Sequence, residues 1–321
     1  MQRLWSVATA LMLSVATQAV AQSFPSRPIR LVVTTPAGVG PDYFVRLYAE
    51  RLTPALGVPV IVENKPSSTG FIAAEFVARA PADGYTVLLA TAQAFTINPV
   101  IYTKLPYDPV ADFEPLTLNA EFSIVLVTHP SVPARTAGEL VEWVKQSGGR
   151  VPYASYGAGT PSHFSGEAFN RAAGLQMLHV PYKGSPGQIQ DLLGGEVKVG
   201  YTVWAASQKL AEAGKLRAIA VTSDERRATL PSVPTMREAG FPDVIAGGWY
   251  GFFVRKGTPD EVAGRLTREF VAVSQIPEMK AKLFEQAIDP FLMVGPPVRN
   301  YLRDETERWR RIAREANFKP E

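Results

Sequence analysis

The sequence predicts an α/β protein built from two doubly wound domains. Short apolar runs alternate with helical patterns along the chain, and this β-α-β order favours mainly parallel sheets with helices on both faces. The chain has 321 residues, which is too long for a single typical hydrophobic core, so two domains are expected. No flexible linker separates the two units, so we expect the chain to cross between them through strands.

Apolar runs and helical spacing predict the elements of the first α/β unit. Strands are expected at 29–33, 58–62 and 85–89. Phe44, Tyr48, Leu52 and Ala55 recur at helical spacing, and a second helix is expected at about 70–80.

A second unit follows in the middle of the chain. Its strands are expected at 124–127, 151–154, 177–180, 197–201 and 216–221. Thr136 and Glu139 fit a capping box, and Thr160-Pro161 and Thr258-Pro259 are typical helix starts. A further strand is expected at 249–254, followed at the end of the chain by an amphipathic helix.

The first 21 residues are typical of a secretory signal peptide. Arg3 precedes an apolar run from Leu4 to about Ala16, and Ala19-Val20-Ala21 is a small-x-small cleavage pattern. The run is short for a membrane span, although a retained anchor is the alternative. We therefore expect a secreted, periplasmic chain that is soluble after cleavage.

Composition excludes several classes of protein. The chain has no cysteine, which rules out a disulfide framework, thiol catalysis and cysteine-bound zinc. Its 33 basic and 30 acidic residues give a net charge of only +3, without the basic stripe of a nucleic-acid-binding protein. No nucleic-acid partner is expected.

Three glycine-rich turns follow predicted strands, at 36–42, 65–70 and 155–160. Ligands of open α/β sheets bind where such turns lead into helices. Backbone N–H groups and small hydroxyls at a helix start favour anions. Each turn alone is more often a plain tight turn, but three in one chain favour an anion-binding site.

Enzyme motifs are largely missing. The chain lacks a G-x-S-x-G nucleophile elbow, a complete dinucleotide fingerprint and H-E-x-x-H. His129, His163 and His179 lack metal-ligand spacing. We expect no cofactor, no metal and no catalysis; the alternative is a secreted hydrolase using Ser162, Ser165 or His163.

Several segments together resemble the Bug receptors, the periplasmic solute-binding proteins of tripartite tricarboxylate transporters. The resemblance covers nearly all of the chain after the signal peptide. It is carried by the order and spacing of 62–66 (VENKP), 81–86 (PADGYT), 97–99 (INP), 104–109 (KLPYDP), 179–184 (HVPYKG), 191–195 (DLLGG) and 213–217 (AGKLR).

The resemblance implies a type II periplasmic-binding-protein fold with a ligand cleft between two α/β domains. Domain 1 would comprise 22–120 and 244–321, and domain 2 would comprise 121–243. It also implies a small carboxylate ligand, a transporter or sensor as membrane partner, and a monomer. The implied ligand-binding residues are Gly38, Val39, Gly40, Asp42, Ser68, Thr69, Thr91, Ser155, Tyr156, Gly157, Gly159, Thr160, His163 and Thr202.

The chain departs from the family pattern at some of these positions. Val39 replaces a glycine, Phe71 a polar residue, Tyr156 a small residue and Thr202 an acid. The added aromatic surface and the lost acid favour a more apolar or aromatic carboxylate, which is a hypothesis about the ligand.

Overall fold

The computed structural model describes residues 24–38, 40–67, 69–316 and 318–320. The predicted signal peptide lies outside these residues. Within them, no helix has the length and apolar character needed to cross a bilayer.

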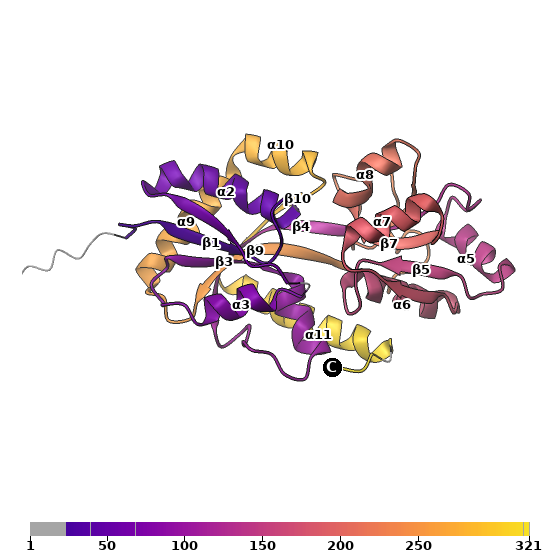
Figure 1. Cartoon of the computed structure of the whole chain (residues 1–321), viewed down its shortest axis with the longest axis horizontal. Helices are drawn as coiled ribbons and strands as arrows, with labels where there is room; N and C mark the ends of the chain where they lie inside the picture. The colour runs from indigo at the N-terminus through magenta and orange to yellow at the C-terminus, as the bar shows by residue number, and fades with distance from the viewer. Residues whose placement is uncertain (1–23, 39, 68, 317, 321) are drawn as a thin grey trace, which may run out of the picture.

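Two α/β lobes lie side by side along the long axis of the molecule (Figure 1). The first lobe contains β1 (Ile29–Val33), α2 (Gly40–Leu56), β2 (Val60–Asn64), α3 (Phe71–Ala78), β3 (Thr86–Thr91), the π-helix η1 (Gln93–Ile97), α4 (Asn98–Ile101), β9 (Gly247–Arg255), α9 (Asp260–Gln275), α10 (Pro277–Glu285) and β10 (Asp289–Val294). The second lobe contains α5 (Ala137–Gln146), β5 (Pro152–Ser155), α6 (Pro161–Ala173), β6 (Leu178–Pro181), α7 (Ser185–Gly194), β7 (Val199–Val203), α8 (Trp204–Glu212) and β8 (Arg217–Val221). β4 (Phe113–Thr128) and α11 (Pro296–Glu315) reach both lobes.

The sheets are parallel where helices connect consecutive strands. β1 pairs in parallel with β2 and β3, and β5 pairs in parallel with β6 and β7. β9, β10, β8 and β4 instead form antiparallel pairs. The prediction of mainly parallel sheets therefore holds for the outer strands, whereas the strands nearest the crossover run antiparallel.

β4 is the principal crossover between the lobes. Its residues 113–123 pair with β9, and its residues 124–128 pair with β7. The chain returns through Ala246 into β9. Buried Thr222 ties the two crossing segments together, because its hydroxyl lies 3.0 Å from the Ile124 carbonyl oxygen and 2.7 Å from that of Ala246.

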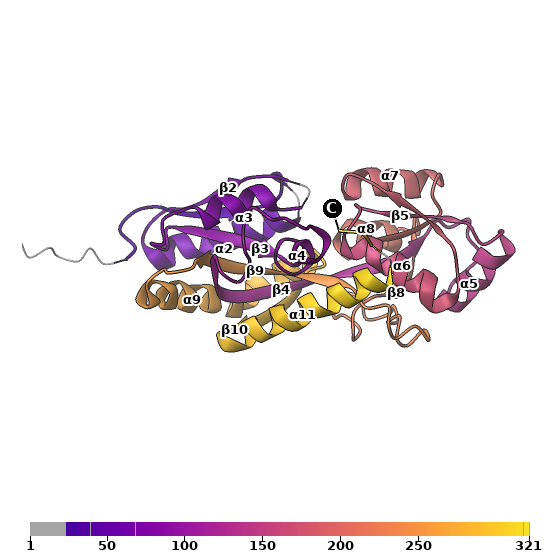
Figure 2. The same ribbon diagram turned by 90° about the horizontal axis from the view of Figure 1, so that it is seen from below.

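α11 is a third connection. It runs beneath β4 and ends beside α6 (Figure 2). Trp309 on α11 is fully buried, and its ring centroid lies 5.8 Å from that of Phe164 on α6. Arg171 and Glu315 form an ion pair of 2.5 Å between the same two helices. Packing and charge therefore fix the end of α11 to the second lobe.

Some local predictions need correction. Thr258 does not cap α9, because its hydroxyl donates to the Arg255 carbonyl at 2.8 Å and the helix begins at Asp260, after Pro259. The strand expected at 124–127 is the end of a strand of 16 residues. β10 was not predicted. By contrast, α5 and α6 begin at the expected caps, Thr136 and Thr160.

Candidate ligand-binding site

The turn between β1 and α2 is held by one buried carboxylate. Asp42 Oδ2 accepts from the Gly38 backbone N–H at 2.8 Å and from Arg46 Nε at 2.9 Å. Asp42 Oδ1 accepts from Asn64 Nδ2 at 2.7 Å, and the same amide nitrogen donates to the Thr35 carbonyl at 2.9 Å. The Asp42 side chain is only 3% exposed. It therefore shapes the turn from within.

The environment of Asp42 favours its charged form. Burial alone would raise the pKa of this carboxyl, but the hydrogen bonds from Arg46, Gly38 and Asn64 outweigh burial and lower the pKa below its usual 3.8. A carboxylate that accepts several such bonds stays ionised at neutral pH.

The 65–70 turn reaches the second lobe through two amide side chains. Asn98 Nδ2 donates to the Thr69 carbonyl at 2.7 Å. Gln93 Nε2 donates to Asn98 Oδ1 at 2.9 Å and to the Gly159 carbonyl at 3.3 Å. Thr91, a predicted site residue, accepts from the Ala94 N–H at 3.4 Å in the same region. This chain of contacts joins the predicted loops of the two lobes.

The 155–160 turn combines a helix cap with close packing. The Thr160 side chain accepts from the His163 N–H at 3.4 Å and donates to the Gly157 carbonyl at 2.7 Å. Gly159 has a φ of +66°, and a Cβ there would lie 2.7 Å from Ile101 Cδ1 of the first lobe. Only glycine suits this backbone conformation and this close approach.

His163 does not extend from this turn as a lone side chain. Its Nδ1 accepts from the Gly159 N–H at 3.1 Å, and its ring stacks on His179 with centroids 3.8 Å apart. Ser155 Oγ lies 2.6 Å from His179 Nε2. Burial lowers the pKa of His163 to about 4 and, together with the charge of His163, that of His179 to about 3. Both rings are therefore neutral at pH 7.

Tyr250 on β9 is where the loops of the two lobes meet. A Cβ at Gly40 would lie 3.9 Å from its hydroxyl oxygen. Burial raises the pKa of Tyr156, and the neighbouring Tyr250 raises it further; hydrogen bonds from the Ser162 N–H and Thr160 act in the opposite direction. Phe122 stacks on Tyr250 with centroids 5.1 Å apart. Gly40 of the first lobe therefore lies beside the Tyr250 hydroxyl, and Tyr156 of the second lobe interacts with Tyr250 electrostatically.

Sequence reasoning missed Tyr250, Phe122 and Gln93. Each lies on or beside a strand. For Phe122 and Gln93 no adjacent glycine or cap marks the position in the sequence. Tyr250 lies two residues after Gly248, so the alternation of a strand places both on the same face, and the glycines around Tyr250 were the available signal.

Several buried polar atoms near these turns have no partner within the described residues: Thr35 Oγ1, Ser67 Oγ, Gln93 Oε1 and Thr202 Oγ1. Thr35 and Ser67 follow the ends of β1 and β2, and Gln93 lies between the lobes. Because buried polar groups are normally hydrogen-bonded, these atoms favour a polar ligand or water at this junction.

The predicted site residues differ in their surroundings. Val39 and Ser68 lie outside the described residues. The Gly38, Gly157 and Gly159 N–H groups are engaged within the protein, by Asp42, Ser155 and His163. Thr202 is buried on β7 and follows Tyr201, whose carbonyl accepts from Ser162 at the start of α6. Phe71 packs on Tyr102, with centroids 4.8 Å apart.

The serines named for a hydrolase are engaged elsewhere. Ser162 Oγ donates to the Tyr201 carbonyl, and Ser165 Oγ donates to the Pro161 carbonyl at 2.8 Å. Two other serines lie beside histidines: Ser155 Oγ is 2.6 Å from His179 Nε2 and is completely buried, and Ser131 Oγ is 2.7 Å from His129 Nδ1 in an exposed turn. The contacts found for these serines are therefore structural ones.

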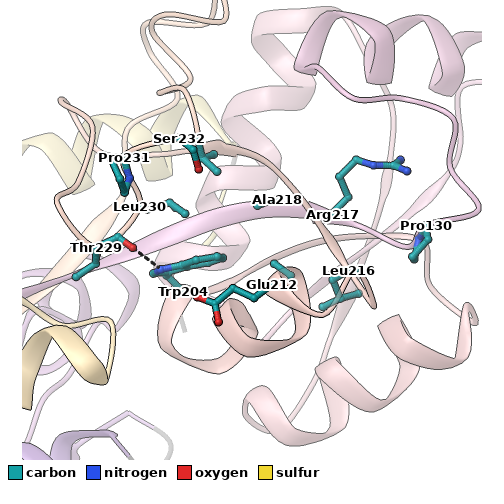
Figure 3. A pocket seen from close by; sticks show the side chains of 13 residues that line it. Pro130, Trp204, Glu212, Leu216, Arg217, Ala218, Thr229, Leu230, Pro231 and Ser232 are labelled. Carbon is teal, nitrogen blue, oxygen red and sulfur yellow. Dashed lines mark hydrogen bonds between the residues drawn. The ribbon is translucent and has the colours of Figure 1, made fainter.

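Surface pockets lie elsewhere on the molecule. One of about 510 Å³ in the second lobe lies beside Trp204, whose indole donates to the Thr229 carbonyl at 3.2 Å (Figure 3). The linings of this pocket and two others include, within the described part of the chain, none of the predicted ligand-binding residues. The described residues also contain no group of three or more acidic or histidine side chains suited to a metal ion.

Comparison with known proteins identifies relatives over almost the whole chain. Residues 44–318 match the family model described as the tripartite tricarboxylate transporter family receptor. Protein BugT of Bordetella pertussis is 31% identical over 300 residues, which cover 93% of this chain and 92% of BugT.

Two solved structures share the fold and carry ligands. Rpa4515 of R. palustris with adipate has a TM-score of 0.85 and 31% identity, covering 93% of this chain and all of that one. MatC of Rhodopseudomonas palustris with bound malate has a TM-score of 0.76 and 26% identity, covering 90% of this chain and 99% of that one. These similarities confirm the predicted two-lobed periplasmic-binding-protein fold. The chain belongs to the tripartite tricarboxylate transporter family of receptors, as its resemblance to the Bug receptors predicted.

Proposed function

We propose that this protein is a periplasmic solute-binding receptor that captures a small carboxylate between its two lobes and presents it to membrane subunits of a tripartite tricarboxylate transporter. The observation that carries this proposal is the junction at Tyr250, whose hydroxyl lies beside Gly40 of the first lobe and which interacts electrostatically with Tyr156 of the second lobe. The adipate and malate bound by related receptors support the ligand class.

The carboxylate would lie between the starts of α2 and α6. The N-terminal end of a helix carries partial positive charge and unpaired N–H groups, so two such ends favour an anion. At α6 the Ser162 N–H and the Thr160 side chain already interact with the Tyr156 hydroxyl. A ligand oxygen would share or replace that contact.

Closure would bring the two lobes together around the ligand. We propose lobes of 22–120 with 244–321 and of 121–243. The exchange of β4 between sheets after Ser123 supports this division. Hinge closure about such crossover strands is a common way to enclose a ligand. Binding without turnover is the corresponding prediction about catalysis.

The surface beside Tyr250 supports an apolar or aromatic carboxylate. Phe122 stacks on Tyr250, Tyr156 lies within electrostatic reach of the same ring, and aromatic surfaces favour stacking with a ligand ring. In calorimetric titrations, we expect benzoate to compete with adipate. Failure of every aromatic acid tested to compete would contradict this part of the proposal.

A thermal-shift screen of the protein expressed as the full chain tests the ligand class. Adipate, malate and benzoate would be the first probes, and N-terminal sequencing would show whether cleavage follows Ala21. A ligand at 100 times its dissociation constant stabilises the folded state by about 2.7 kcal/mol, which raises Tm by several degrees. No shift with any carboxylate, from protein freed of co-purified ligand, would overturn the proposal.

A matched pair of glycine substitutions tests the site. Gly40→Leu would extend a side chain from the first turn of α2 towards Tyr250, whereas Gly138→Leu occupies the first turn of α5 with no atom within 4 Å of its Cβ. We expect Gly40→Leu to weaken carboxylate binding by about tenfold or more, the cost of obstructing a well-packed site. Gly138→Leu should bind normally. Equal affinity in both variants would place the ligand elsewhere.

A further inference from the structure

Two stacked histidines lie behind the 155–160 turn. The rings of His163 and His179 are 3.8 Å apart and within 7° of parallel, and the ring of Tyr153 stacks with His179, with centroids 5.2 Å apart. His163 belongs to α6 and His179 to β6, the strand that pairs with β5. The pair therefore joins a helix, a strand and the turn between β5 and α6.

Each ring holds a different part of the turn. His163 Nδ1 accepts from the Gly159 N–H at 3.1 Å, and His179 Nε2 lies 2.6 Å from Ser155 Oγ. Ser155 Oγ also accepts from the Gly157 N–H at 3.2 Å. Because Nδ1 of His163 is an acceptor, its ring carries its proton on Nε2.

We propose that His163 and His179 are positioning residues that hold the 155–160 turn in its ligand-receiving shape only while both rings are neutral. The turn is a ligand-binding element under the function proposed above, and the inference rests on that function. Acid would then loosen the turn and release the ligand.

Protonation disrupts the arrangement directly. A proton on His163 Nδ1 would face the Gly159 N–H, so two donors would meet and the bond would be lost. Two charged rings 3.8 Å apart would also repel each other. Burial opposes protonation and keeps the pKa values at about 4 for His163 and about 3 for His179.

The neighbouring titratable groups come from three elements. Glu167 on α6 lies 3.9 Å from His163 Nε2 and accepts from the Tyr153 hydroxyl of β5 at 2.6 Å. Tyr201 of β7 lies next to Tyr153, and the C-terminal segment contributes the ring of Phe318 against His163. The Glu167 carboxylate favours a charged His163, but burial outweighs it.

NMR of the ligand-free protein tests the pair without any assumption about function. We expect 15N shifts of His163 to show an unprotonated Nδ1 from pH 8 to 5, with the Gly159 amide proton shifted by its hydrogen bond. Both signals should change together near pH 4. A protonated Nδ1 at neutral pH, or a Gly159 amide that is indifferent to protonation of His163, would overturn the proposal.

Binding of adipate, measured by calorimetry, tests the consequence for the ligand. His163→Gln replaces the ring with an uncharged acceptor, and His129→Gln is the control at a histidine outside the turn. Adipate itself gains protons in acid, so the measured quantity is the ratio of wild-type to His163→Gln affinity at each pH. The ratio should be constant from pH 8 to 5 and fall about fourfold by pH 3.5, as the neutral fraction of His163 falls.

The controls separate the possible outcomes. His129→Gln should follow the wild type at every pH, and His163→Ala should bind more weakly than His163→Gln at neutral pH because it lacks the acceptor. A ratio independent of pH would overturn the positioning role. If adipate bound none of these proteins while the NMR signals behaved as expected, the proposed ligand would be wrong and the histidine pair would stand.

Discussion

Two turns, one in each lobe, are held by opposite kinds of chemistry. The turn between β1 and α2 is fixed by the buried carboxylate of Asp42, whose charged form is favoured by the hydrogen bonds it accepts from Gly38, Arg46 and Asn64. The 155–160 turn is fixed by the imidazole rings of His163 and His179, which are neutral at pH 7. Both turns are intact at neutral pH, but they fail over different pH ranges and by different protonations. The two turns therefore keep their shape together only where Asp42 is charged and both histidines are neutral.

Removal of the carboxylate should have the largest effect. Asp42→Ala leaves three donors without their acceptor, and we expect it to lower the free energy of unfolding by about 3 kcal/mol. Denaturant unfolding measures this quantity. Asp304→Ala, at an exposed ion pair with Arg303, should cost less than about 0.5 kcal/mol. Equal costs for the two variants would show that Asp42 does not hold the first turn.

Acid should weaken the second turn before the first. The pKa of each histidine is lower in the folded protein than its ordinary 6.5, so between pH 6.5 and these lowered values the folded state binds fewer protons than the unfolded state. The stabilisation of the fold by the two neutral rings is complete above pH 6.5 and is lost as pH falls towards 4. The lowering of the His163 pKa from 6.5 to about 4 corresponds to up to about 3 kcal/mol of this loss. Solvent screening reduces this figure little, since the side chain is only 12% exposed.

The comparison of wild type with His163→Gln isolates that contribution. Unfolding free energies measured from pH 7 to 4 should fall less steeply in the variant. The pKa of Asp42 is lowered below 3.8, so its contribution is present above that value and is lost only below it. Parallel pH profiles for the two proteins between pH 6.5 and 4 would contradict the assigned histidine chemistry.

The sequence was informative about these turns to different degrees. Alternating apolar runs and helix-start signals predicted the α/β order, and Thr160-Pro161 correctly placed the start of α6. The glycines marked all three turns. Local patterns could not reveal that His163 stacks on His179, because that contact depends on the pairing of β5 with β6.

Long-range pairing also explains what was missed in the fold. β4 was predicted only at its second half, since Glu114, Pro115 and Glu121 interrupt the apolar pattern of the rest. Glu114 forms ion pairs with Lys256 and Arg299, Pro115 lies at a register shift in the pairing with β9, and Glu121 forms an ion pair with Arg227. Each is therefore tolerated in the strand. Tyr250 was predicted to lie on a strand, but its position between the lobes follows from the antiparallel pairing of β9 with β4.

The cap of α6 is the next test of the second turn. Thr160→Ala removes the acceptor for the His163 N–H and should lower the free energy of unfolding by about 1 kcal/mol. Thr136→Ala removes the equivalent cap of α5, which accepts from Glu139 at 3.1 Å, and should cost a similar amount. Only Thr160→Ala should also weaken carboxylate binding. Weakening in both variants would indicate a general loss of stability and not a role in the site.

The smallest effect should come from the outermost donor to Asp42. Arg46 is 51% exposed, so water and salt screen its ion pair with the buried carboxylate. We expect Arg46→Gln to lower the free energy of unfolding by only about 0.5 kcal/mol, because the Gly38 and Asn64 donors remain. Arg79→Gln, at the exposed i,i+4 pair with Glu75, is the matched control. If Arg46→Gln cost as much as Asp42→Ala, the first turn would depend on an exposed ion pair. It would then be sensitive to ionic strength, unlike the second turn, whose neutral rings give salt little charge to screen.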